Sequence, residues 1–453
     1  MPTFGTDGVR GLANVELTPE YALVLGRAAA RVLGRDCWAI GRDTRRSGPM
    51  LEAAFAAGLA SEGSDVVSLG VSPTPEVAWW SASEKAPAAV ISASHNPFAD
   101  NGIKIFSAGG RKLPDEAEAR IESEIRKLGI SAAAAAVGAV TGEDPPTGQG
   151  VGNIVSYSAH AGYGGAVAAS IEGRRLDGLR VVVDCANGAA SVVAPDLLRS
   201  LGAEVEVLHG APDGVNINDR CGSTHPSDLQ LAVHSHRAEV GVAFDGDADR
   251  VLFVDGHSRV VDGDQTMAIC AIDLAARELL PDDTVVVTVM TNLGFRLAMA
   301  ERGINVVDTK VGDRYVLEAL EAGGYALGGE QSGHVIFRDL ATTGDGLLTA
   351  VQLLDVVVRS GRSLGMLADD AMTRLPQVLK NVRVTGSTPA AELAGRLASH
   401  IAHVEDDLGE LGRVLVRPSG TEPLVRVMVE APTEVQAEAA ASRLVSALEA
   451  MAG

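Results

Sequence analysis

The chain has 453 residues, and 38 Lys plus Arg against 59 Asp plus Glu give it a formal net charge of −21. So acidic a protein excludes a nucleic-acid partner, which needs a basic surface, and disfavours an anionic membrane partner as well. With 46% hydrophobic residues the chain can build buried cores, roughly two to four domains at 100–200 residues each. A disordered or fibrous protein is excluded.

The cysteines and the N-terminus bear on the cellular compartment. Cys37, Cys185, Cys221 and Cys270 lie far apart without a CxxC pair, which predicts neither a zinc knuckle nor a disulfide framework and favours a reducing compartment. The first residues lack the cationic and apolar regions of a signal peptide, and no apolar run approaches the roughly 18 residues of a membrane span. We therefore expect a cytoplasmic protein.

One pattern occurs three times along the chain: an apolar strand, a helix ending at a glycine, a second strand, and a last strand that runs into a polar loop. The glycines are Gly63, Gly202 and Gly303, each expected just past a helix end in the left-handed conformation. The last strands lead into ISASHNP, FDGDADR and GGEQSGH. Apolar strands alternating with helices predict three similar α/β units with mixed, mostly parallel sheets. Ligands bind beyond the carboxyl ends of such strands, so we expect the three loops to converge on one cleft.

We expect four domains, at residues 1–150, 151–254, 255–368 and 369–453. Residues 131–150, rich in Ala and Gly, are typical of a flexible connection between the first two domains. After residue 368 the pattern changes. A strand near Val382, an amphipathic helix over residues 390–404, two strands flanking RPSGTEP and a closing helix predict a smaller α+β domain with a hairpin loop.

The second loop carries Asp245, Asp247 and Asp249 at alternate positions. In an extended segment such residues share one side, so three carboxylates would converge and require a hard cation, for which Mg²⁺ is the natural choice. An EF-hand is excluded, because its sixth position would be Arg250 and its twelfth Gly256. An aspartyl-nucleophile phosphatase, with phosphate carried on Asp245, stays open as an alternative, as does a solvated acidic turn.

The first loop offers Ser94 and the nearby Ser92 as candidate nucleophiles, and the residues alone do not separate the two. A Ser/His/Asp hydrolase is disfavoured, because the Gly-x-Ser-x-Gly elbow is missing and neighbours on an extended loop, Ser94 and His95, should point opposite ways. Lys104 follows on the next predicted strand and is one of only six lysines. It can serve as an acid or base when partly buried, or it can be a gatekeeper on an edge strand.

The motif RPSGTEP predicts a phosphate cradle in the last domain. It combines Arg417 with the hydroxyls of Ser419 and Thr421 and with backbone N–H groups around Gly420. No complete GxxxxGK[ST] or GxGxxG motif is present, which disfavours nucleotide-loop enzymes and Rossmann dehydrogenases.

ISASHNP, DGDADR, GEQSGH and RPSGTEP occur in this order, one in each expected domain. With them the chain resembles the α-D-phosphohexomutase superfamily over essentially its whole length. The opening FGTDGVRG and the motif GEQSGH are most similar to the bacterial phosphoglucosamine mutase branch, which interconverts glucosamine 6-phosphate and glucosamine 1-phosphate for UDP-N-acetylglucosamine and cell-wall precursor synthesis. The resemblance implies a heart-shaped molecule of four domains and an intramolecular phosphotransferase that works through a phosphoserine and a 1,6-bisphosphate.

The resemblance also implies roles for individual residues. The implied metal ligands, around one Mg²⁺, are Ser94, Asp245, Asp247 and Asp249. The residues implied at the transferring phosphoryl group are Ser94, the phosphoserine, with His95, Lys104, Arg10 and Arg250. The implied sugar readers are Glu330, Ser332 and His334, and the implied phosphate clamp is Arg417, Ser419, Gly420 and Thr421.

The implied partners are a small-molecule sugar phosphate and a hexose 1,6-bisphosphate that acts as activator and intermediate, without nucleic acid or membrane and with a homodimer left open. Three alternatives to the phosphoglucosamine mutase activity remain at this stage. They are a phosphomannomutase or phosphoglucomutase of the same superfamily, a sugar-phosphate phosphatase, and a catalytically silent sugar-phosphate binder.

Overall fold

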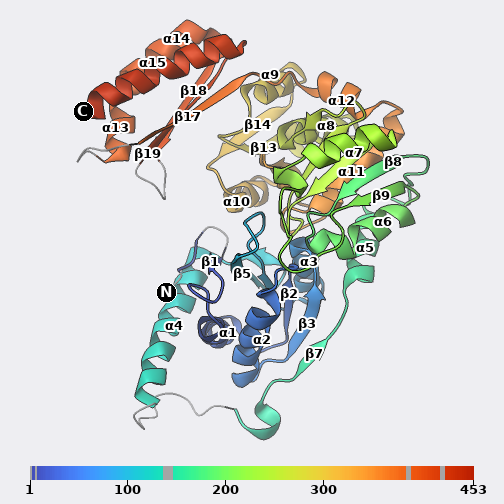
Figure 1. Cartoon of the computed structure of the whole chain (residues 1–453), viewed down its shortest axis with the longest axis vertical. Helices are drawn as coiled ribbons and strands as arrows, with labels where there is room; N and C mark the ends of the chain where they lie inside the picture. Colours follow the sequence, from blue (N-terminus) through green and yellow to red (C-terminus); the bar gives the residue numbers. More distant parts are fainter. Residues whose placement is uncertain (1–2, 6–7, 136–145, 384–388, 419–423, 453) are drawn as a thin grey trace. The chain divides into compact units, whose positions relative to one another are not determined.

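The computed structural model describes residues 3–5, 8–135, 146–383, 389–418 and 424–452. They form two compact units. Unit 1 comprises Met1–Val289 and Val307–Ala368, and unit 2 comprises Met290–Val306 and Asp369–Gly453. Unit 1 is built on three sheets and unit 2 on a smaller one (Figure 1). None of the described helices is both long enough and apolar enough to cross a lipid bilayer.

The first sheet of unit 1 has seven strands flanked by helices. Its elements are β1 (Val9–Leu12), α1 (Pro19–Leu33), β2 (Trp38–Arg42), α2 (Gly48–Ser61), β3 (Val66–Val71), α3 (Thr74–Glu84), β4 (Ala88–Ile91), β5 (Asp100–Ser107), β6 (Arg111–Lys112), α4 (Asp115–Ala135) and β7 (Ile154–Ser156). The strand order is β1-β5-β4-β2-β3-β7, with β6 beside β5. Strands β4, β2, β3 and β7 are parallel, and β5 is antiparallel to its neighbours β4 and β1.

Both faces of this sheet are covered, as the near-continuous apolar strands predict. Trp38 and Ile40 of β2 pack into the core formed with α1, α2 and α4. Ala39, which lies between them, packs against Val77 of α3 on the opposite face. The alternation follows from the two-residue period of a strand, and it gives a three-layer arrangement (Figure 1).

The helix-ending glycines behave as predicted. Gly63, Gly202 and Gly303 have φ values of 93°, 101° and 71°, the left-handed region that glycine enters without a steric penalty. The expected connection over residues 131–150 is partly wrong, because α4 continues to Ala135; residues 136–145 lie outside the described residues.

The second sheet has five strands in the order β12-β11-β10-β8-β9. Its elements are α5 (His160–Ala169), β8 (Arg180–Asp184), α6 (Ala194–Ser200), β9 (Glu204–Leu208), the 3₁₀ turn η3 (Gly222–Thr224), α7 (Ser227–His236), β10 (Val240–Phe244), β11 (Val251–Asp255) and β12 (Val260–Val261). Strands β10, β8 and β9 are parallel, whereas β11 is antiparallel to both of its neighbours.

The third sheet has four strands in the order β14-β13-β15-β16. The elements of this region are α8 (Gly263–Ala276), β13 (Thr284–Thr288), α9 (Leu293–Glu301), β14 (Asn305–Thr309), α10 (Asp313–Gly323), β15 (Leu327–Gly329), β16 (Val335–Phe337), α11 (Gly346–Ser360) and α12 (Leu364–Ala371). Strands β13 and β15 are parallel and β16 is antiparallel to β15. The sheets of unit 1 are thus mixed, with parallel strands at their centres, as predicted.

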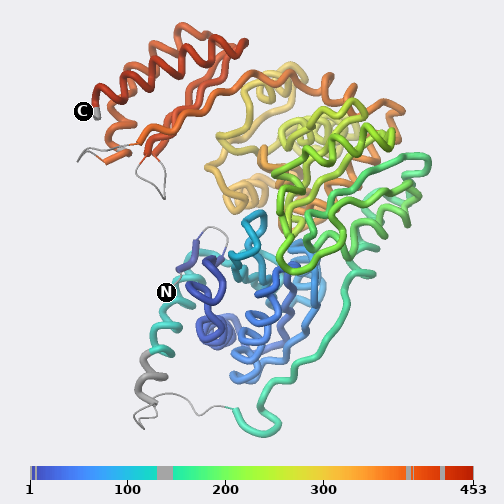
Figure 2. Tube along the Cα trace, viewed as in Figure 1, coloured from blue at the N-terminus to red at the C-terminus, as the bar shows by residue number. Residues whose placement is uncertain are grey.

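Unit 2 contains an antiparallel sheet in the order β17-β19-β18. Its elements are β17 (Gln377–Arg383), α13 (Ala390–Arg396), α14 (Ala398–Leu408), β18 (Arg413–Pro418), β19 (Leu424–Glu430) and α15 (Glu434–Ala452), orange to red in Figure 2. Strands β18 and β19 form the predicted hairpin. The single helix expected over residues 390–404 is wrong: Leu397 N donates to Ala394 O in a tighter turn that buries Leu397 in the core, so two helices form.

Residues 290–306, which connect β13 to the first residues of β14, belong to unit 2. Asn292, which caps α9, donates through Nδ2 to Glu430 Oε1 over 3.2 Å. Leu293 N donates to Glu430 Oε2 over 2.9 Å. The last residue of β19 therefore anchors the start of a helix that is more than a hundred positions away in the sequence.

Candidate active site

Three loops that follow parallel strands meet in unit 1. Ser94 comes after β4, Asp245 after β10 and Glu330 after β15. Ser94 Oγ donates to Asp245 Oδ2 over 2.5 Å. Asp249 of the second loop and Glu330 of the third both line a cleft of about 450 Å³. The loops converge as predicted, since the carboxyl ends of parallel strands share one edge of each sheet.

Ser94 adopts a backbone conformation that only a few L-residues enter. Its φ is 52°, and its side chain is fully buried. The left-handed backbone turns Ser94 Oγ to within 3.4 Å of His95 Nδ1, so the prediction that these neighbours point opposite ways is wrong. Strained residues of this kind persist where surrounding contacts hold them, often at functional sites.

Arg45, a fully buried cation that follows β2, stabilises the strained backbone of Ser94. Arg45 Nη2 donates to the carbonyl oxygens of Ser94 at 2.9 Å and Asn96 at 2.8 Å. Its Nη1 donates to the carbonyl of Asp100 at 3.0 Å, and its Nε donates to Asp43 Oδ2 at 2.8 Å. Arg45 was not predicted from the sequence, although its position after β2 places it at the same sheet edge as the Ser94 loop.

The two serines of the first loop differ in their contacts. Ser92 Oγ donates to Asp43 Oδ2 over 2.6 Å and accepts from Ser94 N over 2.9 Å. The Ser92 hydroxyl therefore holds the loop, whereas the Ser94 hydroxyl faces the aspartates. This contrast, which the residues alone could not supply, favours Ser94 as the nucleophile.

Carboxylate oxygens of Asp245, Asp247 and Asp249 lie within 4.8 Å of one another. All three side chains are buried. The predicted reason for their convergence, an extended segment, is wrong. Ala248 has φ 58° and its N–H donates to Asp245 O, so a turn rather than a strand brings the carboxylates together.

The donor set fits a hard divalent cation. Among the described residues, Asp247 Oδ1 and Asp249 Oδ1 are buried without a hydrogen-bond partner, which is costly for carboxylate oxygens unless a cation binds them. Burial and the charges of Asp249 and Asp247 raise the pKa of Asp245 well above its usual range. A metal ion would reverse that shift, so the triad could hold one.

Lys104 lies inside the acidic cluster. Its Nζ donates to Asp247 Oδ2 at 2.8 Å and to Asp249 Oδ2 at 3.2 Å, and Thr74 Oγ1 also donates to Asp247 Oδ2, at 2.6 Å. Although burial acts in the other direction, the charge of Lys104 lowers the pKa of Asp249 well below its usual range. The gatekeeper interpretation is wrong, because β5 lies between β1 and β4 and is not an edge strand.

His95 lies between Ser94 and Arg250. Burial and the charges of Arg250 and Arg10 lower its pKa, and Arg250 Nη1 donates to His95 Nδ1 over 3.1 Å. The lone pair that faces Ser94 is therefore engaged by a guanidinium. Arg10 of β1 and Arg250 also line the cleft, where they add positive charge beside the aspartates.

The third loop reaches the cleft through Glu330, whose Oε1 accepts from Gly312 N over 3.0 Å. Of the predicted sugar readers, Glu330 is among the cleft-lining residues that the structure describes, and Ser332 and His334 are not. Ser332 is exposed. Its part in reading a sugar stays a prediction.

His334 lies behind the aspartates. It is 2% exposed, its Nε2 accepts from Gly344 N over 3.1 Å, and its Nδ1 lies 3.9 Å from Asp249 Oδ2. These contacts suit a residue that orients Asp249. A role in reading sugar hydroxyls likewise stays a prediction.

In unit 2, Arg417 of β18 lies directly opposite Arg426 of β19. Burial and the charge of Arg426 lower the pKa of Arg417, and Arg426 Nε is buried without a hydrogen-bond partner in the described part of the chain. Like charges opposite one another destabilise a sheet, so the pair favours a bound anion. Arg426 was missed in the sequence analysis; Ser419, Gly420 and Thr421 lie outside the described residues.

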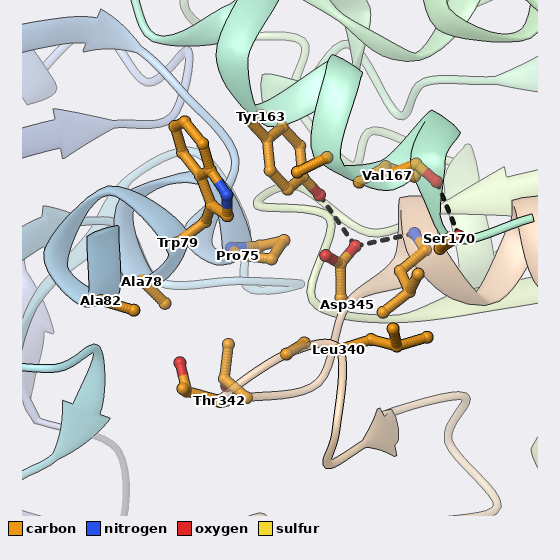
Figure 3. A pocket seen from close by; sticks show the side chains of 14 residues that line it. Pro75, Ala78, Trp79, Ala82, Tyr163, Val167, Ser170, Leu340, Thr342 and Asp345 are labelled. Atoms are coloured by element: carbon orange, nitrogen blue, oxygen red, sulfur yellow. Dashed lines mark hydrogen bonds between the residues drawn. The ribbon is translucent and has the colours of Figure 1, made fainter. Parts of the chain in front are cut away.

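A second cavity in unit 1, of about 90 Å³, lies between α3, α5 and residues 340–345. Figure 3 shows Trp79 and Tyr163 on its wall, with Tyr163 Oη donating to Asp345 Oδ1 over 2.8 Å. Burial raises the pKa of Asp345 to about 6. Asp345 is the only charged residue in the described lining, so this cavity is poorly suited to a sugar phosphate.

Comparisons with known proteins identify the family of the chain. Four models of the phosphoglucomutase/phosphomannomutase family match: alpha/beta/alpha domain I over residues 1–130, domain II over 157–258, domain III over 262–375 and the C-terminal domain over 379–447.

Individual relatives cover nearly the whole chain. A phosphoglucosamine mutase of Frankia alni is 54% identical, with 99% of this chain and 98% of that protein covered. The crystal structure of a phosphoglucomutase/phosphomannomutase family protein from Burkholderia thailandensis matches with a TM-score of 0.78, 25% identity and coverage of 98% and 97%. N-acetylphosphoglucosamine mutase from Aspergillus fumigatus, solved with GlcNAc-6P and magnesium, shares the fold at a TM-score of 0.71, 18% identity and coverage of 100% and 96%. The chain therefore belongs to the phosphoglucomutase/phosphomannomutase family, on its phosphoglucosamine mutase branch, and is a phosphohexomutase of the isomerase class.

Proposed function

We propose that this phosphohexomutase interconverts glucosamine 6-phosphate and glucosamine 1-phosphate through a phosphoserine at Ser94 and a 1,6-bisphosphate intermediate. The observation that carries the proposal is the 2.5 Å contact of Ser94 Oγ with Asp245 Oδ2 in the buried triad. The choice of glucosamine rests on the 54% identity to a relative named for that substrate.

In the proposed reaction, phospho-Ser94 gives its phosphoryl group to the free hydroxyl of the sugar monophosphate. The bond from phosphorus to Ser94 Oγ breaks as the bond to the sugar oxygen forms, which produces the 1,6-bisphosphate. The bisphosphate then presents its other phosphate to Ser94, and return of that group releases the isomeric monophosphate. Catalysis of such a transfer depends on positioning and on charge. The hydrogen bonds from Arg45 to the Ser94 loop provide the positioning, and the surrounding cations provide the charge.

The charges of the site suit this chemistry. Phosphoserine carries a charge of about −2, and the triad adds carboxylates, so positive groups are required. Arg10 and Arg250 at the cleft and Lys104 within the triad supply them. A Mg²⁺ ion held by Asp245, Asp247, Asp249 and the Ser94 oxygen would stabilise negative charge on the transferring phosphoryl oxygens.

The remaining predicted residues complete the proposal. Glu330, Ser332 and His334 would read the sugar, and Arg417, Ser419, Gly420 and Thr421 would hold the phosphate that is not transferred. A hexose 1,6-bisphosphate would prime the enzyme by phosphorylating Ser94. These roles follow the four proposed domains, 1–150, 151–254, 255–368 and 369–453, each of which supplies one loop.

Phosphate mapping tests the nucleophile. After incubation with glucose 1,6-bisphosphate, intact mass and peptide mapping should place one phosphate on Ser94, with none in Ser94→Ala. Ser92→Ala is the matched control: it removes the neighbouring hydroxyl and should still be labelled at Ser94. Full mutase turnover by Ser94→Ala would contradict the proposal. A label that hydroxylamine cleaves would instead indicate an acyl phosphate on Asp245 and a phosphatase.

A substrate panel and metal removal test the rest. Coupled assays with glucosamine, glucose and mannose 6-phosphates should give the highest kcat/KM for glucosamine 6-phosphate; a preference for glucose or mannose would indicate one of the related mutases. Absence of turnover with all three would indicate a binding protein. EDTA should abolish activity and added Mg²⁺ should restore it, because Asp247 Oδ1 and Asp249 Oδ1 are otherwise buried without a hydrogen-bond partner in the described part of the chain. Activity that survives stripping would remove the metal from the proposal.

A further inference from the structure

A second cluster of metal-binding side-chain types lies at the second sheet of unit 1, and the proposed mutase reaction does not use it. Asp184 ends β8, His209 follows β9 and Cys221 precedes η3. One donor atom of each lies within 4.8 Å of the other two. Asp184 and Cys221 are fully buried, and the His209 side chain is 26% exposed.

The carboxylate of this cluster is held in place by the backbone. Ala186 N donates to Asp184 Oδ1 and Gly222 N donates to Asp184 Oδ2, each over 2.9 Å. A carboxylate has about four acceptor sites, so both oxygens keep a lone pair. Asp184 is therefore oriented toward the cluster and still able to bind a cation.

Both ring nitrogens of the histidine lie near carboxylates. His209 Nδ1 lies 3.1 Å from Asp184 Oδ1, yet it is buried and has no partner with hydrogen-bond geometry among the residues described. Its other nitrogen, Nε2, lies 3.5 Å from Asp228 Oδ2. Histidines that bind a metal through one nitrogen commonly turn the other toward a carboxylate.

The combination of donors selects the class of cation. A thiol and an imidazole beside one carboxylate suit Zn²⁺, whereas Mg²⁺ prefers oxygen ligands alone. Burial raises the pKa of the Cys221 thiol to about 12, so the thiol is neutral in the metal-free protein and would lose its proton on binding. The all-oxygen triad and this mixed cluster should thus discriminate between the two metals.

We propose that Asp184, His209 and Cys221 form a binding site for a zinc-class divalent cation, with water as the fourth ligand, separate from the Asp245 triad. The competing arrangement is a metal-free ion pair, in which a His209 imidazolium lies between the carboxylates of Asp184 and Asp228. The two arrangements differ in whether the Cys221 sulfur is a ligand.

The cation would stabilise a segment that supports the catalytic loop. Asn218, three residues before Cys221, donates through Nδ2 to the carbonyl oxygens of Ser94 at 2.9 Å and Asn96 at 3.1 Å. Its backbone N–H donates to Ala186 O over 2.9 Å. Fixing Cys221 therefore restrains Asn218, and through it the backbone of Ser94.

Cobalt titration of the full-length protein tests the proposal. Protein stripped with a chelator and returned to excess Mg²⁺ is titrated with Co²⁺, a spectroscopic substitute for Zn²⁺ that gives a near-ultraviolet thiolate charge-transfer band only when a cysteine is bound. We expect the band to saturate at one Co²⁺ per chain and to disappear when Zn²⁺ is added. The band should be lost in Cys221→Ala and retained in Cys185→Ala, the matched control at an adjacent buried thiol.

The oxygen-only triad cannot give this band, so Asp247→Asn should retain it. Because the wild-type protein is measured first, misfolding of a variant cannot conceal the result. Absence of the band in the wild type, or its persistence in Cys221→Ala, would overturn the proposal and leave the metal-free ion pair. The cobalt band reports whether a cysteine binds the ion and does not depend on turnover, so its outcome is independent of the mutase assay.

Discussion

Among single residues, Arg45 offers a direct test of how the Ser94 loop is held, because it contacts that loop without lining the described cleft. In Arg45→Lys the charge is kept, but an ammonium cannot reproduce the planar fork of donors. We expect kcat to fall about 100-fold, the effect of misplacing a reacting group by roughly 1 Å, while KM changes by less than about threefold. Steady-state kinetics and the rate of Ser94 phosphorylation measure the two effects.

Arg42→Lys is the matched control. Arg42 is the last residue of β2, the strand that Arg45 follows, and it pairs with Glu52 over 2.8 Å. None of its described contacts reaches the Ser94 loop. An equal loss of kcat in both variants would show that Arg45 contributes only general stability.

Asp345 provides a prediction of pH dependence. Burial raises its pKa from 3.8 to about 6, so between these values the folded protein binds the proton and the unfolded chain does not. The free energy of unfolding therefore falls as pH rises through this window, by up to about 3 kcal/mol for roughly two pKa units. In Asp345→Asn the amide oxygen can still accept from Tyr163 Oη and Leu348 N, but it cannot ionise.

We accordingly expect Asp345→Asn to gain stability relative to the wild type on going from pH 4.5 to pH 7.5. Urea denaturation at the two pH values measures the difference, and the pH 4.5 comparison serves as the internal control. A difference that does not change with pH would contradict the assignment of the raised pKa to Asp345.

Among the elements, the hairpin of β18 and β19 carries the paired cations Arg417 and Arg426. Arg417→Gln removes a contact that would serve ground state and transition state alike, so KM should rise by about tenfold while kcat falls less. The substrate-free enzyme should gain roughly 0.2–1 kcal/mol of stability, because the opposed charges are relieved. Kinetics and thermal denaturation at low salt check the two changes.

Arg443→Gln is the control for this variant. Arg443 lies on α15 of the same unit and pairs with Asp407 on the surface, so KM should be unchanged. If Arg417→Gln left KM unchanged as well, the hairpin would have no part in holding substrate phosphate.

The elements themselves were largely predictable, because strands and helix ends are local. Gly63, like the two equivalent glycines, needs only its own backbone freedom to end a helix. The division of the expected helix at Leu397 was not predictable, since it depends on packing against a sheet that forms elsewhere in the chain.

The candidate site was predictable in its residue types and less so in its geometry. The spacing of Asp245, Asp247 and Asp249 indicated a cation site. The two-residue period of a strand, however, does not predict the turn that brings them together. The direction of His95 depends on the φ of Ser94, which in turn depends on Arg45, about fifty positions earlier. Contacts of this range carry no local signal.

For the whole molecule, the division into units predicts the effect of truncation. Residues 290–306 belong to unit 2, and α9 begins on contacts from Asn292 and Leu293 to Glu430. A chain ending at residue 368 should therefore lose more than a phosphate clamp, because α9 loses its partners. We expect faster amide hydrogen exchange over residues 290–306 and a lower melting temperature.

The full-length variant Glu430→Ala is the matched comparison for the truncation. It removes the anchoring carboxylate and keeps the rest of unit 2, so it should loosen the start of α9 and leave the exchange of β4 and β10 unchanged. Unaltered exchange over residues 290–306 in the truncated chain would show that this segment is stable without unit 2.

The same division constrains how enzymes of this family can be recombined. The chain passes between the two units three times, after Val289, after Val306 and after Ala368. A chimera joined at residue 368 would set a foreign sheet against a native α9, with a mismatched anchor in place of Glu430. A phosphate-binding unit taken from a relative should be transferable only as two exchanged segments, so natural variation in this unit is expected to keep residues 290–306 matched to the C-terminal sheet.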